Sequence, residues 1–239
     1  MAGKKIQAVV VDGDNTLWKG IAAESIGKSI LINELKKGHL KKFLRGVSAG
    51  KKLKSNIGKS PGFKDIGTAQ LDFYSVLIEN DLGKINEMIS VARKHIKRNI
   101  LHEVSNLIFQ ISQEGIPVFL STASGSTVAE AAKNLFNITD SVSNTELFNK
   151  DGNLTGVELT ITNGQTKLDR TIKLLNKYDI KITDCVVIGD SVLDVPLFKS
   201  SRHAVFSPLA NNDIKQIKSV TGATISSTKV YSITRHIIK

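Results

Sequence analysis

The sequence is poor in cysteine. Its single cysteine, Cys185, excludes an internal disulfide and a metal site built from several cysteines. This scarcity favours a reducing, cytoplasmic setting. Otherwise the composition is ordinary, because 41% of the 239 residues are hydrophobic and 23% are charged. Such values exclude collagen-like, low-complexity and disordered chains, and they predict a globular protein.

Long apolar runs are also absent. The longest, such as residues 6–11 and 116–120, are far too short to cross a bilayer, so we expect no transmembrane segment. The N-terminal stretch MAGKKIQAVVVDGD leads into a charged turn without a small-residue cleavage site. We therefore expect no signal peptide.

Acidic residues are few relative to basic ones. The chain has 33 Lys and Arg against 22 Asp and Glu, a net charge of +11. Residues 19–100 carry most of this excess, with 17 basic against 7 acidic residues. The excess could be a solvated surface, could steer an anionic phosphorylated substrate, or could dock on nucleic acid or anionic lipid. The few aromatic residues in this segment disfavour base stacking, and the third alternative is the least favoured.

Apolar runs alternate with helical patterns along most of the chain. Strands are predicted over 6–11, 116–120, 185–188 and 204–206, with a hairpin over 145–162. Helices are predicted over 101–113, 127–136, 167–178 and 226–238, and from about residue 211. This alternation predicts an α/β fold with a doubly wound, Rossmann-like parallel sheet.

Residues 19–100 interrupt the alternation and contain no good strand. Helices are predicted over 22–45, 68–80 and 83–98, with a Gly/Lys/Ser-rich stretch over 47–62. We therefore predict a basic helical cap, residues 19–100, inserted into a catalytic core formed by residues 1–18 and 101–239.

Polar side chains follow three of the predicted strands. They are Asp12 and Asp14, Ser121 and Thr122, and Asp190 and Asp194. In open parallel sheets the carboxyl ends of the strands form the ligand site, so these groups should converge. Clustered carboxylates are costly without a cation, and oxygen ligands alone suit Mg²⁺. Such a cluster suits phosphoryl transfer, in which a carboxylate can act as nucleophile.

Four segments resemble the motifs of the haloacid dehalogenase superfamily, in its phosphatase form and in the family's order. They are VVVDGDNT (9–16), VFLST (118–122), Lys167 at the start of a helix, and VVIGDSVLD (186–194). The GlyAsnLeuThrGly turn at 152–156 and the position of the cap resemble the phosphoserine-phosphatase-like branch.

The resemblance implies a role for each matching residue. Asp12 would be the nucleophile and a Mg²⁺ ligand, and Asp14 the general acid and base whose main-chain oxygen also touches the metal. Lys167 would bridge nucleophile and phosphate. Asp190 would bind the metal, and Asp194 would support either the metal site or Lys167.

The phosphate site implied by the resemblance contains a hydroxyl and backbone N–H groups, including that of Gly13. Ser121 and Thr122 compete for the role of the hydroxyl, and the sequence favours Ser121 because it closes the run ValPheLeu. Trp18 directly follows the catalytic turn, where it would pack at the hinge of the cap or form a wall of the substrate pocket.

The resulting hypothesis is a Mg²⁺-dependent phosphatase that hydrolyses a small phosphomonoester through a phospho-aspartyl intermediate. The alternatives are a phosphotransferase with the same site and a non-enzymatic protein that binds polyanions through the cap. Phosphoserine is a doubtful substrate, because the branch's substrate-reading glutamate would fall near Ile21 and the nearest acid is Glu24.

One C-terminal segment resembles a different motif. ValThrGlyAlaThrIleSerSer, residues 220–227, is similar to a signature at which some flavin-binding domains receive covalent FMN on threonine, here Thr224. Lys218 stands at the place of the usual aspartate. The rest of a flavin domain is missing, so we favour a turn that opens the last helix.

Overall fold

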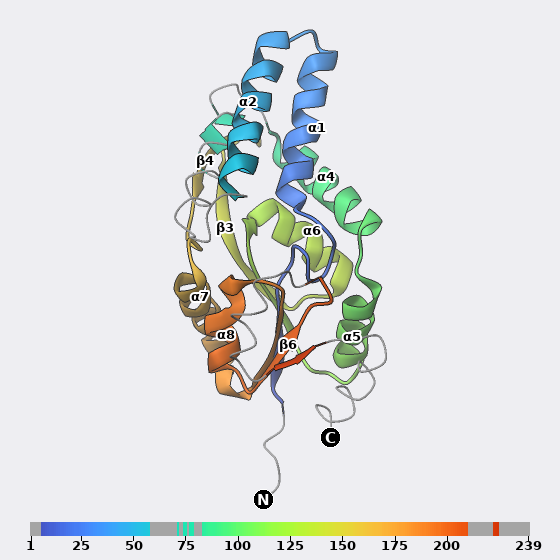
Figure 1. Cartoon of the computed structure of the whole chain (residues 1–239), viewed down its shortest axis with the longest axis vertical. Coiled ribbons are helices and arrows are strands. Elements are labelled where there is room, and N and C mark those ends of the chain that lie inside the picture. Colours follow the sequence, from blue (N-terminus) through green and yellow to red (C-terminus); the bar gives the residue numbers. More distant parts are fainter. Residues whose placement is uncertain are drawn as a thin grey trace, which may run out of the picture.

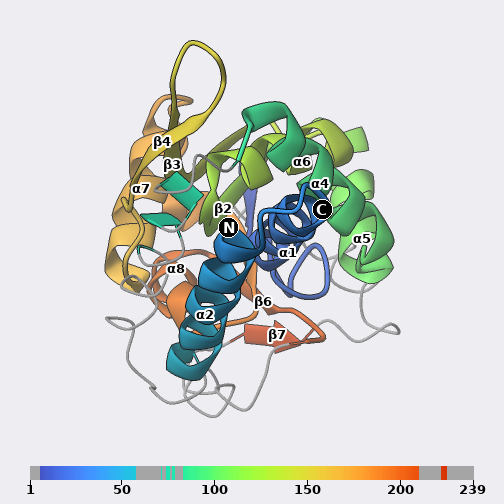
Figure 2. The ribbon, with the colours of Figure 1, turned by 90° about the horizontal axis from the view of Figure 1, so that it is seen from above.

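A parallel β-sheet forms the centre of the molecule (Figures 1 and 2). The computed structural model describes residues 6–57, 71, 74, 75, 77, 78, 83–209 and 222–224. The strands are β1 (Ala8–Val11), β2 (Val118–Gly125), β3 (Asp140–Phe148), β4 (Leu154–Glu158), β5 (Cys185–Gly189), β6 (His203–Phe206) and β7 (Gly222–Thr224). Their order is β4-β3-β2-β1-β5-β6-β7, and only the β3–β4 pair is antiparallel. The predicted fold class is confirmed.

Both faces of the sheet are covered, which explains the purely apolar sequence of β1. Val9 and Val11 point into one hydrophobic cluster, and Ala8 and Val10 point into the other. Every residue of β1 and β5 is buried. Strands of a parallel sheet that are covered on both faces require such continuous apolar runs, and this is the pattern that made them recognisable in the sequence.

Helices of the core flank the sheet on both faces. They are α5 (His102–Gln113), α6 (Ser126–Phe136), α7 (Gly164–Asn176) and α8 (Val195–Ser200), with 3₁₀ turns η1 (Ile182–Asp184) and η2 (Val192–Asp194). Helix α7 begins with a capping box, in which Asn163 Oδ1 accepts the Thr166 N–H at 2.9 Å and Thr166 Oγ1 accepts the Asn163 N–H at 3.0 Å. This cap fixes the first turn of α7, which carries Lys167.

Three further helices lie between β1 and α5 in the sequence. They are α1 (Ala22–Lys36), α2 (Leu40–Ile57) and α4 (Ile85–Arg98), and they lie at one end of the sheet (Figure 1). Helices α1 and α2 form a hairpin that projects beyond the end of the sheet (Figure 1). No helix in the described part of the chain is long and apolar enough to cross a membrane.

The prediction of one helix over 22–45 is wrong. The chain turns between α1 and α2 at Gly38, whose φ of +81° is a conformation that other residues rarely adopt. Glu34 holds the turn by accepting hydrogen bonds from Lys37 Nζ at 2.8 Å and His39 Nδ1 at 2.7 Å. The Gly/Lys/Ser-rich stretch over 47–62, placed between two predicted helices, is helical as far as Ile57, because its lysines and alanine favour helix.

Other expectations fall partly outside the described residues. Of the helix predicted over 68–80, residues 71, 74, 75, 77 and 78 are described and are helical. The helices predicted from about 211 and over 226–238 lie outside. Thr224 belongs to strand β7 rather than to the expected turn, since β7 pairs with the edge of β6. A strand of three residues is too short to give a periodic pattern.

Candidate active site

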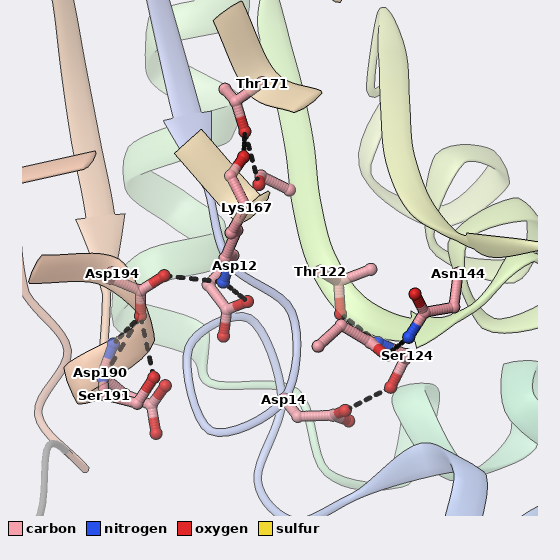
Figure 3. A network of polar contacts seen from close by, with 12 residues as sticks. Asp12, Asp14, Thr122, Ser124, Asn144, Lys167, Thr171, Asp190, Ser191 and Asp194 are labelled. Atoms are coloured by element: carbon pink, nitrogen blue, oxygen red, sulfur yellow. Dashed lines mark hydrogen bonds and ion pairs between the residues drawn. The ribbon is translucent and has the colours of Figure 1, made fainter. Parts of the chain in front are cut away.

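The carboxyl ends of three neighbouring strands bring the predicted polar residues to one edge of the sheet (Figure 3). In the register of the sheet, Val11 of β1 lies opposite Leu120 of β2 and Ile188 of β5. The residues that follow these positions therefore leave the sheet side by side. The order of the sheet, with β1 between β2 and β5, is what makes distant parts of the sequence meet.

Lys167 joins two carboxylates at the centre of this edge. Its Nζ donates to Asp12 Oδ1 at 2.7 Å and to Asp194 Oδ1 at 2.6 Å (Figure 3). The lysine is 1% exposed, and both carboxylates are buried. Charge-assisted bonds of this length fix all three side chains, so α7 is tied to the ends of β1 and to the turn after β5.

The pKa values in this cluster are shifted by burial and by mutual charge. Burial raises the pKa of Asp12 to about 7, Lys167 opposes this shift, and Asp194 adds to it. Burial, followed by the charges of Asp12 and Asp194, raises the pKa of Asp190 to about 9. Burial alone would lower the pKa of Lys167, but the two carboxylates that it contacts raise it above its ordinary value. The lysine is therefore a cation in a cluster in which Asp12 and Asp190 resist ionisation.

Asp194 organises the turn after β5. Its Oδ2 accepts the N–H groups of Asp190 and Ser191 and the hydroxyl of Ser191, each at 3.2 Å. A Cβ on Gly189 would lie 2.5 Å from the same oxygen, so only glycine leaves room for this carboxylate. Both oxygens of Asp194 are thus already engaged, one by Lys167 and one by the turn.

Three carboxylates are close enough to share one cation. Asp12, Asp190 and Asp194 each offer an oxygen within 4.8 Å of the others. Among the described residues, only Lys167 forms ion pairs with the carboxylates of this cluster. Since one cation faces three carboxylates and all the ligand atoms are oxygens, these residues could hold a divalent metal ion of the hard class.

Asp14 is separate from that cluster and is held by three donors. Its Oδ1 accepts Trp18 Nε1 at 2.7 Å and the Ala22 N–H at 2.9 Å, and its Oδ2 accepts the Ser124 hydroxyl at 2.5 Å (Figure 3). Burial raises the pKa of Asp14, although these hydrogen bonds oppose the shift. The carboxylate is therefore fixed in orientation and retains its proton more readily than an exposed aspartate.

None of these three contacts was predicted from the sequence. The Trp18 indole is fully buried, stacks on Phe136 with a centroid distance of 6.4 Å and donates a hydrogen bond to Asp14, which agrees with the packing alternative. Ser124 was not considered. The available signal was its position at the end of β2, next to Ser121 and Thr122.

Ser121 and Thr122 point to different surroundings. The Ser121 hydroxyl is buried and forms a hydrogen bond of 2.8 Å with Thr171 Oγ1 on α7. Thr122 Oγ1 accepts the Ser124 N–H at 3.1 Å and lies 3.3 Å from the position that a Cβ on Gly13 would occupy. The Thr122 hydroxyl therefore lies beside the turn that follows Asp12, whereas the Ser121 hydroxyl is used between β2 and α7.

Gly13 permits this close approach. A Cβ at this position would lie 2.7 Å from Trp18 Cη2, which is closer than real Cβ contacts. The carbonyl of Gly13 accepts the N–H groups of Thr16 at 3.1 Å and Leu17 at 2.8 Å, which closes the turn after β1. The glycine thus lets the tryptophan lie directly against the turn that carries both aspartates.

Sequence comparison identifies the class of protein that this fold and site define. The haloacid dehalogenase-like hydrolase model matches residues 9–199, and the chain belongs to this family. The expected family is thereby confirmed. No curated protein sequence is significantly similar to the chain.

Solved structures with the same fold include proteins of the phosphoserine phosphatase type. A protein of unknown function from Bordetella pertussis Tohama I has a TM-score of 0.72 at 13% identity, over 94% of this chain and 100% of its own. A phospho-aspartyl intermediate analogue of phosphoserine phosphatase has a TM-score of 0.66 at 19% identity, over 98% and 100%. A phosphoserine phosphohydrolase-like protein from Francisella tularensis subsp. tularensis SCHU S4 has 0.64 at 14%, over 95% and 99%. At these identities, the similarity establishes the fold alone.

Proposed function

We propose that the protein is a Mg²⁺-dependent phosphatase that hydrolyses a small phosphomonoester through a phosphorylated Asp12. The observation that carries this proposal is the arrangement of two carboxylates with different environments. Asp12 lies among ion-pairing groups and accepts Lys167 Nζ on one oxygen, whereas Asp14 is held apart by Trp18 and Ser124. Two-step phosphoryl transfer requires one carboxylate that attacks phosphorus and another that carries a proton.

In the first step, a carboxylate oxygen of Asp12 attacks phosphorus and the ester P–O bond breaks. Asp14 gives its proton to the leaving alkoxide, which departs as the alcohol. Lys167, which already lies 2.7 Å from Asp12, holds the attacking carboxylate in place and offsets the negative charge of the phosphoryl oxygens. Because Asp12 is held by a buried ion pair, little reorganisation precedes attack.

In the second step, Asp14 removes a proton from a water molecule whose oxygen attacks phosphorus. The bond between Asp12 and phosphorus breaks, and inorganic phosphate leaves. Asp14 returns to its protonated form and Asp12 to its carboxylate. Burial raises the pKa of Asp14, and this direction favours the protonated form that the first step needs and the second step restores.

The proposed metal ligands are Asp12, Asp190 and the main-chain oxygen of Asp14. Asp194, predicted as a possible metal ligand, already accepts hydrogen bonds on both oxygens, so we assign it to positioning Lys167 and the Asp190 turn. Bound Mg²⁺ supplies charge neutralisation at the phosphoryl oxygens. Asp190 forms no ion pair with a described residue, and its raised pKa supports a metal ion at this carboxylate.

We propose Thr122, rather than the favoured Ser121, as the hydroxyl that binds the phosphate. Thr122 Oγ1 lies beside Gly13, whereas the hydroxyl of Ser121 is engaged with Thr171. The N–H of Gly13 lies in the turn between the two catalytic aspartates and is proposed as a second donor to the phosphate.

Residues 19–100 are proposed as the cap that covers this site and selects the leaving group. Helices α1, α2 and α4 of this segment lie at the end of the sheet (Figure 2). Glu24, the acid closest in sequence to Ile21, pairs with Lys28 at 3.5 Å on the surface of α1. This placement supports a substrate other than phosphoserine.

The central experiment compares Asp12→Asn with the wild-type protein, with p-nitrophenyl phosphate as substrate. We expect Asp12→Asn to abolish turnover with an unchanged circular dichroism spectrum, and a chelator to stop wild-type turnover until Mg²⁺ is restored. Asp151→Asn, in the exposed β3–β4 turn, is the matched control and should retain full activity. Full activity in Asp12→Asn would overturn the mechanism. A phosphorylated alcohol, formed when a competing alcohol is added, would instead identify a phosphotransferase.

A further inference from the structure

We propose that the end of the α1–α2 hairpin, residues 32–45, docks on an anionic lipid bilayer. We call this segment the hairpin tip. Helices α1 and α2 project beyond the other described elements, and the tip lies at their far end (Figure 1). The tip lies within the proposed cap but contributes no residue to the acidic cluster or to Lys167, so a test of lipid binding does not depend on the proposed phosphatase.

Exposed apolar side chains gather at the hairpin tip. Ile32 is 49% exposed, Leu35 43%, Leu40 55% and Leu44 56%. These are four of the nine large apolar side chains that are exposed in the described part of the chain. Single exposed leucines are ordinary on protein surfaces, but a group of them at the end of one projecting element indicates a contact surface.

Basic side chains surround these leucines. The tip contains five of them, Lys36, Lys37, Lys41, Lys42 and Arg45, and its only acidic residue is Glu34. Glu34 is buried and already binds Lys37 and His39. The exposed surface of the tip is therefore cationic as well as apolar.

The order of residues on α2 gives the tip the character of an interfacial helix. Leu40 and Leu44 are one turn apart, and Lys41 and Arg45 directly follow them. All four side chains are exposed. On an anionic bilayer, the leucines would enter the boundary between headgroups and acyl chains while the neighbouring cations contact lipid phosphates.

This combination favours a bilayer over other anionic partners. Nucleic acid would neutralise the lysines but would leave the leucines in water. A second copy of the chain would bring two cationic tips together, which is repulsive. A bilayer supplies both negative charge and a hydrocarbon phase, and its surface can deform around a projecting tip.

The test is sedimentation with vesicles of phosphatidylcholine alone or of phosphatidylcholine mixed with phosphatidylserine. We expect the wild-type protein to bind only the mixed vesicles and to bind less as salt increases. Leu40→Ser/Leu44→Ser and Lys41→Glu/Arg45→Glu should each weaken binding by about tenfold or more.

Matched controls lie on the core. Phe109→Ser removes another exposed apolar side chain, and Lys173→Glu/Lys199→Glu reverses two exposed charges, without touching the tip. Both should bind vesicles like the wild type, and circular dichroism and thermal unfolding should show that the tip variants remain folded.

Three results would overturn the proposal. They are the absence of binding to phosphatidylserine vesicles at low salt, equal losses in the tip and core variants, and binding that is insensitive to Leu40→Ser/Leu44→Ser. Tighter binding to RNA than to vesicles, with the same indifference to the leucines, would assign the surface to nucleic acid instead.

Discussion

A single buried lysine determines the state of the whole candidate site. Lys167 faces Asp12 and Asp194 at hydrogen-bond distance, and Asp190 lies within reach of both carboxylates. Buried charges of one sign are tolerated only when an opposite charge accompanies them. The lysine therefore has two functions at once, because it orients the proposed nucleophile and makes its burial possible.

The first prediction concerns the variant Lys167→Met, which removes the cation and keeps most of the side-chain volume. Leaving Asp12 and Asp194 unpaired should lower the free energy of unfolding of the metal-free protein by about 3–5 kcal/mol. Urea unfolding measures this loss, and turnover should fall by about a hundredfold or more. Lys173→Met, at an exposed position of the same helix, should change neither quantity. Normal stability in Lys167→Met would show that the ion pairs are dispensable.

The second prediction concerns Trp18→Phe, which retains an aromatic ring and loses the N–H that binds Asp14 at 2.7 Å. We expect turnover of an alkyl phosphate to fall by about tenfold and that of p-nitrophenyl phosphate to fall much less. The reason is that a poor leaving group needs a well-oriented proton donor, whereas p-nitrophenolate leaves without one.

Phe136→Leu is the control for this prediction. It disturbs the same aromatic stack, in which the ring centroids are 6.4 Å apart, and it leaves the hydrogen bond between Trp18 and Asp14 in place. Its effect should be equal for both substrates. An equal loss on both substrates in Trp18→Phe would mean that Trp18 acts only through packing.

Among the helices and strands, the best-predicted segments are those whose sequence pattern has a single physical cause, such as burial of both faces of a strand. Strands β1 and β5 are recognisable because both of their faces are buried, and their ends carry Asp12 and Asp190. The hairpin of β3 and β4 was recognisable from its turn residues, Asp151 and Gly152. The register of the sheet then brings the predicted polar residues together without further information.

The sequence did not predict the local structure where several tertiary contacts together determine it. The break between α1 and α2 depends on Gly38 and on the bonds of Glu34, which a helical periodicity does not reveal. The orientations of Ser121 and Thr122 depend on whether Thr171 or Gly13 lies next to each hydroxyl. Neither neighbour is close in the sequence, so the choice between the hydroxyls required the packed structure.

The third prediction tests the turn between α1 and α2. Gly38 has a φ of +81°, and a Cβ there would meet no atom within 4 Å, so Gly38→Ala introduces backbone strain without a clash. We expect a loss of about 1 kcal/mol in the free energy of unfolding, measured by thermal or urea unfolding. Gly38→Asn should lose less, because asparagine tolerates this conformation better. Identical stabilities for both variants would contradict the conformational explanation.

At the scale of the whole molecule, charge of each sign is concentrated in a different place. The basic excess lies in residues 19–100, whereas Asp12, Asp190 and Asp194 gather at the end of the sheet. The stability of the fold therefore depends on pH, because Asp12 and Asp190 are easier to protonate in the folded protein than in the unfolded chain. A bound cation would offset this dependence, which links the proposed metal to stability as well as to catalysis.

The fourth prediction follows from the sign of these shifts. In the folded protein the pKa of Asp12 is raised to about 7 and that of Asp190 to about 9, from an ordinary value of 3.8. Between pH 3.8 and about 9, the folded state therefore binds more protons than the unfolded state. The free energy of unfolding of the metal-free protein should therefore fall as the pH rises from 5 to 9, by at least about 2 kcal/mol.

Mg²⁺ should remove most of this dependence, because it favours the ionised carboxylates that high pH produces. Thermal unfolding at several pH values, with chelator or with Mg²⁺, measures both effects, and the increase in Tm on adding Mg²⁺ should grow with pH. Other groups also titrate in this range, such as His203, whose pKa is lowered by burial. The variant Asp190→Asn separates the contribution of the acidic cluster from theirs. In this variant the metal-free protein should lose less stability with rising pH and gain less from Mg²⁺. A wild-type Tm increase that is independent of pH would place the bound cation away from these carboxylates.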